Sequence, residues 1–177
     1  MKKIILLSTL FCILVCNAGL CQTWTPTTYE VSFKIKNAGV TVTGRFTGLK
    51  TTLNFSPEKP ESGSLKASVE VATIKTGIDK RDQDLQEEKY FNALQYKTIE
   101  MSSTKLYKTD NGYKGMFDVT IKGVTKKIEI PFSFTESGDE GTFMGSFPLS
   151  RKDFGVGGKT LTMSDALTVN IMIKAKK

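Results

Sequence analysis

Residues 29–36 read Tyr-Glu-Val-Ser-Phe-Lys-Ile-Lys, so every second side chain is apolar. Successive side chains of a β-strand point to opposite faces, and this alternation therefore predicts a strand with one buried face. The same pattern recurs almost to the C-terminus, in residues 40–46, 49–55, 65–71, 98–106, 113–121, 128–134, 143–149 and 167–173. Because the chain offers little helix to cover these apolar faces, an antiparallel sheet closed into a barrel is the expected fold.

The number of strands depends on the change of parity at Gly48. Apolar residues occupy even positions before this glycine, as in Phe46, and odd positions after it, as in Leu53. A bulge at Gly48 would bend one long strand without ending it. Counted in this way, the chain has about eight strands, a number typical of small barrels. No repeat or linker divides it, so we predict an all-β fold with a single antiparallel barrel.

Only the region around residues 80–92 breaks the alternation. Most of its side chains favour helix over strand. We predict one short helix here, with an apolar stripe that packs on the barrel near an opening. The stripe would consist of Leu85, Lys89, Tyr90 and Phe91.

The N-terminus has the features of a targeting segment. Two lysines precede an apolar run over residues 4–15, which is too short to span a bilayer, and small residues follow it. We predict a cleaved secretory signal over residues 1–21, cut after Ala18 or Cys21, and a barrel domain over residues 22–177. The protein would then be periplasmic or secreted. A lipoprotein signal is less favoured, because Leu20 is bulkier than the residue that usually precedes a lipidated cysteine.

Cysteine content and charge exclude two further classes of protein. Cys12, Cys16 and Cys21 all lie in or beside the predicted leader, so the barrel has no disulfide. The formal net charge of +7 is spread along the chain without a long basic run. A nucleic-acid-binding surface normally gathers its cations, and we expect no nucleic-acid partner.

The residue types needed for most catalysis are missing. The chain has no histidine and the barrel domain has no internal cysteine. A Ser-His-Asp triad, an ordinary zinc or haem site and a thiol nucleophile are therefore not expected, and we predict neither an enzyme nor a metal or cofactor. Carboxylate chemistry or calcium binding remains as an alternative, but a solvated helix face is favoured for Asp79, Asp82, Asp84, Glu87 and Glu88.

The interior of the barrel must carry the functional argument. Alternation assigns the inward face to Phe33, Val42, Phe46, Val69, Val71, Phe117, Val119, Phe132, Phe147 and Ile171. Alternation alone does not distinguish a packed core from a cavity lined by these side chains.

Six local motifs, spread in a fixed order over residues 24–174, are typical of one protein family. They are Val42-Thr43-Gly44-Arg45-Phe46, Ile74-Lys75-Thr76-Gly77, the helical segment with Lys89-Tyr90-Phe91-Asn92, Thr98-Ile99-Glu100-Met101, the run from Val119 to Lys126, and the run from Ser150 to Val156. With these motifs the chain resembles the YceI-like proteins, a lipocalin-like family of bacterial periplasmic polyisoprenoid-binding proteins. Members often carry a histidine in the helical segment, where this chain has Asp84, and a proline where it has Lys97.

The resemblance implies a lipocalin-like barrel that binds or carries an amphiphilic isoprenoid-type lipid, a polyisoprenoid or a quinone, along its axis. Ile35, Ile130 and Val169 would then join the ten inward residues in lining a lipid tunnel. A polar head group would meet Arg45, Arg81, Arg151 or Lys152 at the mouth. The alternative is a dry-cored barrel or sandwich with a role in envelope stress or adhesion and no small ligand. Transient membrane contact and a homodimer through the exterior Met116 and Met172 are further expectations.

Overall fold

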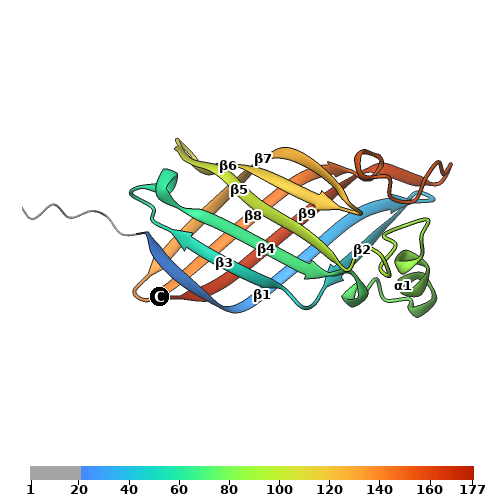
Figure 1. Cartoon of the computed structure of the whole chain (residues 1–177), viewed down its shortest axis with the longest axis horizontal. Coiled ribbons are helices and arrows are strands. Elements are labelled where there is room, and N and C mark those ends of the chain that lie inside the picture. The colour runs from blue at the N-terminus through green and yellow to red at the C-terminus, as the bar shows by residue number, and fades with distance from the viewer. Residues whose placement is uncertain (1–20) are drawn as a thin grey trace, which may run out of the picture.

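The alternating segments form nine antiparallel strands and a single α-helix in the computed structural model, which describes residues 21–177 (Figure 1). The predicted leader lies outside the described residues, except for Cys21. The strands are β1 (Gln22–Asn37), β2 (Val40–Phe46), β3 (Lys50–Phe55), β4 (Ser64–Glu70), β5 (Thr98–Thr109), β6 (Gly112–Ile121), β7 (Val124–Ser137), β8 (Glu140–Ser150) and β9 (Met163–Lys176), and the helix is α1 (Asp79–Gln86).

The sheet closes on itself as a ring of eight strand positions. Its order is β2-β1-β3-β4-β5-β6-β7-β8-β9, and β9 returns to pair with β1. Strands β2 and β3 share one position, because both pair with β1 in the same register: Phe46 lies opposite Val31 and Leu53 opposite Trp24. The predicted all-β, eight-position barrel is therefore confirmed.

The bend at Gly48 differs in kind from the predicted bulge. Val31 follows Trp24 by seven positions and Leu53 follows Phe46 by seven, so no extra residue enters opposite β1. The chain instead leaves the sheet at residues 47–49, where Gly48 adopts a φ of 99° that a side chain would strain. Its N–H donates a 2.8 Å hydrogen bond to the hydroxyl of Tyr29. Both strands change their inward face over this stretch, which explains the change of parity in the sequence.

One half of the barrel is packed with aromatic rings. Trp24 is 2 % exposed and Phe55 is fully buried, and the indole N–H donates a 3.1 Å hydrogen bond to the Phe55 carbonyl. Phe55 makes edge-to-face contacts with rings from three other strands, at centroid distances of 5.0–5.7 Å. This closed end comprises Trp24, Phe55, Tyr113, Phe132, Phe134 and Phe143.

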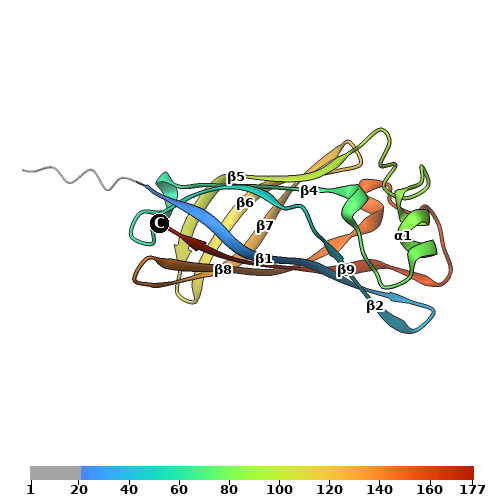
Figure 2. The same ribbon diagram turned by 90° about the horizontal axis from the view of Figure 1, so that it is seen from below.

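Helix α1 lies at the opposite end of the barrel (Figure 2). It ends at Gln86, earlier than the predicted segment, because Glu87 takes an extended conformation and residues 87–97 continue as turns. Short 3₁₀ turns at Val71–Thr73 and Arg151–Phe154 flank the same end. None of the helices in residues 21–177 is long and apolar enough to cross a membrane.

Candidate functional site

A cavity of about 420 Å³ fills the half of the barrel that α1 covers. Alternate residues of β1, namely Val31, Phe33 and Ile35, form one wall of it and pair with inward-facing residues of β9. The volume falls within the roughly 300–1,000 Å³ typical of small-molecule pockets. The lining is predominantly apolar, so the cavity is suited to a hydrocarbon chain.

The structure places nine of the thirteen predicted tunnel residues along this cavity. They are Phe33, Ile35, Val42, Phe46, Val69, Val119, Phe147, Val169 and Ile171. The other four lie elsewhere. Phe117, Ile130 and Phe132 face inward but belong to the packed half of the barrel. Val71 follows the end of β4, in a 3₁₀ turn, and is buried away from the cavity.

A glycine on the inward face of β2 makes room for an aromatic wall. Phe33 pairs with Gly44 across the two strands. A Cβ atom on Gly44 would lie 2.2 Å from the ring of Phe33, so the ring lies directly against the backbone of β2. Larger residues at position 44 would push Phe33 into the cavity and narrow it.

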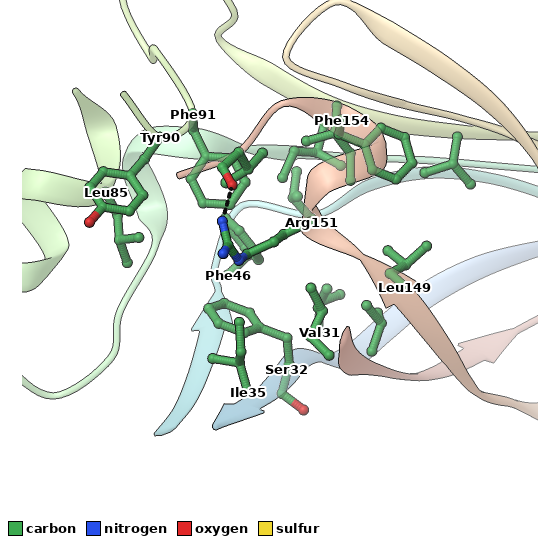
Figure 3. A pocket seen from close by; sticks show the side chains of 18 of the residues that line it. Val31, Ser32, Ile35, Phe46, Leu85, Tyr90, Phe91, Leu149, Arg151 and Phe154 are labelled. Carbon is green, nitrogen blue, oxygen red and sulfur yellow. Dashed lines mark hydrogen bonds between the residues drawn. The ribbon is translucent and has the colours of Figure 1, made fainter. Parts of the chain in front are cut away.

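Side chains of α1 and the following turns cover the mouth of the cavity. Leu85, Tyr90 and Phe91 all line it, and Phe91 packs edge-to-face on Phe46 at a centroid distance of 6.3 Å (Figure 3). Lys89 is exposed instead, but its carbonyl accepts a 2.9 Å hydrogen bond from the N–H of Gly157. This bond joins the two segments that border the mouth, residues 76–97 and residues 151–163.

A buried carboxylate ties α1 to Thr76, next to Lys75, whose backbone pairs with Arg45 of β2. Asp82 is 3 % exposed and accepts hydrogen bonds from the hydroxyl and the N–H of Thr76, at 2.6 and 2.8 Å. Arg81 donates from Nε to the same hydroxyl and from Nη2 to the Thr76 carbonyl, both at 2.7 Å. The hydrogen bond from the Thr76 hydroxyl is the main cause that holds the pKa of Asp82 below its ordinary value.

Replacing Asp82 with alanine should lower the free energy of unfolding by about 1–3 kcal/mol at neutral pH. The N–H and the hydroxyl of Thr76 then lose their charged acceptor. A carboxyl group with a depressed pKa stabilises the fold above its unfolded pKa of about 4, and this contribution is lost as the pH falls through the lower folded value. Denaturant titrations at several pH values should therefore show that the difference in the free energy of unfolding between Asp82→Ala and the wild type disappears in acid.

The matched control for this prediction is Asp84→Ala on the same helix. Asp84 forms a surface ion pair with Lys80 and is 40 % exposed, so its removal should cost less than about 1 kcal/mol. A deficit for Asp82→Ala that is equally small, or that persists unchanged below pH 2, would contradict the assigned role of its carboxylate.

Arg151 lines the cavity, but its donors serve the surrounding loop (Figure 3). The side chain is 4 % exposed. It donates to the carbonyls of Val156, Gly158 and Ser164 at 2.7–3.0 Å, and to the Asp165 carboxylate at 2.8 Å. Further bonds reach the hydroxyl of Thr160 and the carbonyl of Met163. The guanidinium therefore organises residues 151–165 rather than leaving donors for a head group.

The three other predicted head-group cations differ in position. Arg81 lines the cavity at its mouth, whereas Arg45 and Lys152 do not border it. Arg45 lies between the inward-facing Gly44 and Phe46 and therefore points outward. Lys152 is half exposed and pairs with Asp165 at 2.6 Å.

Several polar residues at the cavity were not predicted from the sequence. Asn37 continues the inward-facing row of β1 toward the mouth, and its Oδ1 atom is buried without a hydrogen-bond partner in the described part of the chain. Asp84 and Glu100 also line the cavity. Extending the alternation of β1 by one step would have identified Asn37. With Arg81, the two carboxylates give the mouth both signs of charge.

A second, smaller cavity of about 70 Å³ lies toward the closed end of the barrel. Phe117, Ile130 and Phe143 line it, so it belongs to the packed half. Four residues line both cavities and form the wall between them: Ala67, Met101, Phe147 and Ile171. The large cavity therefore ends at this wall.

Comparisons with known proteins place the chain in a family. It is 27 % identical over 138 residues to the UPF0312 protein of Pseudomonas fluorescens, covering 71 % of this chain and 70 % of that one. The fold is similar to that of BcnA from Burkholderia cenocepacia, with a TM-score of 0.80, 24 % identity and coverage of 84 % and 96 %. It is also similar to that of a polyisoprenoid binding domain from Saccharophagus degradans, with a TM-score of 0.67, 13 % identity and coverage of 89 % and 98 %. The family model of the YceI-like domain matches residues 23–175, and the chain belongs to this family.

Proposed function

We propose that the protein binds an isoprenoid-type lipid, a polyisoprenoid or a quinone, in its barrel cavity and carries it outside the cytoplasm. The observation that carries the proposal is the apolar cavity of about 420 Å³, open at the end covered by α1. Membership of the YceI-like family and the fold shared with a polyisoprenoid binding domain support a barrel that binds lipid-like ligands.

The energetics of burial favour such a ligand. Each buried CH₂ group contributes about 0.8 kcal/mol, so a few isoprene units contribute roughly 10 kcal/mol before the costs of association are subtracted. Aromatic and branched aliphatic side chains make up most of the lining, as a prenyl tail requires. In this proposal the nine cavity residues contact the tail, and Arg81 and Asn37 contact the head group.

Binding without turnover is the function that this lining supports. The cavity borders only scattered polar groups, and the carboxylate of Asp82, which lies outside it, is already bonded to Thr76. The cavity also counts against a dry-cored barrel with a purely adhesive role, because a dry core would be filled throughout. We further propose a periplasmic or secreted location, on the basis of the leader sequence.

Native mass spectrometry of the chain from Gln22 onward, which contains every strand, tests the proposal. We expect a discrete added mass that organic extraction releases as a prenyl lipid. A lipid-free mass that persists after incubation with farnesol, geranylgeraniol and a long-chain quinone would exclude the proposal.

The wall between the two cavities should limit the length of the bound chain. In Phe147→Ala the large cavity would open into the 70 Å³ cavity, and an equimolar ladder of linear prenyl alcohols should then yield complexes with longer chains than the wild type retains. Leu149→Ala is the control, because Leu149 lies on the same face of β8 but borders only the large cavity. Equal chain lengths in Phe147→Ala and the wild type would show that this wall does not set the limit. Phe147→Leu provides a milder change if the alanine variant unfolds.

A further inference from the structure

Exposed apolar side chains gather at the mouth end of the barrel. Seven large apolar residues are exposed in the part of the chain that the structure describes, and Tyr29 and Met144 lie on the barrel wall. The other five lie in, or directly after, five separate connections at the mouth end, and we call them the apolar rim: Val40, Ile78, Leu94, Val124 and Leu161.

Hydrogen bonds hold the loops that carry the rim residues next to one another. The N–H of Ala38, beside Val40, donates a 2.8 Å hydrogen bond to the carbonyl of Thr162, beside Leu161. Lys122 Nζ donates to the carbonyls of Glu88 and Gly155 at 2.7 and 3.1 Å. These bonds connect the β1–β2 hairpin, the β6–β7 turn and the two covering segments. The segments that carry the five rim residues are therefore joined at one end of the barrel.

Most of the rim side chains have more than half of their surface exposed to solvent. Leu94 and Leu161 are 94 % and 107 % exposed, and Val40 and Ile78 are 66 % and 53 % exposed. Single exposed apolar residues are ordinary on protein surfaces. Their concentration at one end, around the opening of the apolar cavity inside the barrel, indicates a surface that contacts an apolar phase.

Lysines accompany the rim. Lys36, Lys97, Lys126 and Lys159 are exposed, lie within four residues of a rim residue, and form no salt bridge within residues 21–177. Apolar side chains flanked by lysines match the interface of a membrane that contains anionic lipids. Asp79, Glu87 and Glu88 lie at the same end, so charge alone would bind weakly and the apolar rim must contribute.

We propose that the apolar rim docks on the surface of a membrane containing anionic lipids, with the rim residues entering the interface and the flanking lysines meeting the lipid phosphates. Docking in this orientation places the mouth of the cavity against the bilayer. A lipid can then pass between bilayer and barrel without crossing water. The docking goes beyond the proposed lipid binding and can be tested without it.

Sedimentation of the chain from Gln22 with vesicles tests the docking. The vesicles contain phosphatidylcholine with about one third phosphatidylglycerol, or phosphatidylcholine alone. We expect preferential binding to the anionic vesicles, and a loss of at least about tenfold in partitioning when Val40, Ile78, Leu94 and Leu161 are all replaced by serine. Replacing the four lysines by glutamine should reduce only the preference for anionic vesicles, by up to about fivefold per lysine.

Met144→Ser is the matched control, because Met144 is 52 % exposed on the barrel wall and its loss should leave vesicle binding unchanged. Wild-type protein that does not bind anionic vesicles, or a serine variant that binds them equally well, would overturn the docking. So would a wild-type dimer that the serine variant dissociates without any vesicle binding, because the rim would then contact a second copy. Lipid retention, measured on the same samples, reports separately on the cavity: vesicle binding by a protein that never holds lipid would contradict the proposed function and leave the docking intact.

Discussion

Val169→Asp should abolish the retention of lipid while the barrel remains folded. Val169 faces the cavity from β9, where it pairs with Phe33 on one side and Phe147 on the other. The cavity is open at the end that α1 covers, so we expect water to reach the new carboxylate in the lipid-free protein. A bound prenyl tail would displace that water and leave the charge against hydrocarbon, at a cost of several kcal/mol. Native mass spectrometry should show only lipid-free protein.

Thr168→Asp is the matched control for this loss. Thr168 is the preceding residue on β9, it is exposed on the outer face, and it pairs with Lys34. The same charge at this position should leave lipid retention unchanged, and both variants should keep the β-sheet circular dichroism of the wild type. Retention by a folded Val169→Asp protein would show that the lipid does not occupy this cavity.

The sequence predicts which face of a strand points inward, but not how far along the barrel a residue lies. Period-two alternation identifies the face of a strand, and all the inward residues named from β6 and β7 do face inward. Alternation contains no information on depth along the barrel axis. Phe117 and Phe132 therefore looked like tunnel residues, although they pack in the closed half, where a charge would unfold the protein.

The covering segment shows a second limit of the sequence. Helix formers over residues 80–92 correctly predicted an interruption of the sheet, and Leu85, Tyr90 and Phe91 do lie over the cavity. The helix ends at Gln86 because the chain then turns: the N–H groups of Tyr90 and Asn92 donate to the Glu87 carbonyl, and the N–H of the distant Gly157 donates to the carbonyl of Lys89. Such tertiary contacts override intrinsic propensity and leave no periodic signal.

Arg151 illustrates the same limit for a single side chain. Near the mouth of a barrel, an arginine in a glycine-rich segment is an obvious candidate for binding an anionic head group. Only the fold reveals that the carbonyls of residues 156–164 turn inward and surround its guanidinium. Four of the six acceptors are backbone carbonyls, which no pattern of residue types could identify.

Arg151→Met should lower the free energy of unfolding by about 3–5 kcal/mol, as expected when one partner of a buried charged network is removed. Methionine keeps most of the side-chain length but donates no hydrogen bond, so several carbonyls and the inner oxygen of Asp165 lose their donor. Phe154 and Val156 border the cavity from the same loop. We therefore expect the variant to unfold at a lower temperature and a lower denaturant concentration than the wild type. It should also lose most of its affinity for lipid.

Two further variants distinguish the effect of the Arg151 hydrogen bonds from the effect of its positive charge. Lys152→Met removes the neighbouring cation, which is half exposed and pairs only with the outer oxygen of Asp165, and should cost less than about 1 kcal/mol. Arg151→Lys keeps the charge but cannot satisfy acceptors on several sides at once, so its stability should remain closer to that of Arg151→Met than to the wild type. Full stability of Arg151→Lys would mean that the positive charge alone holds the loop and that the hydrogen bonds to the carbonyls contribute little. A loop held instead by those bonds keeps one wall of the cavity fixed whether or not a lipid is bound.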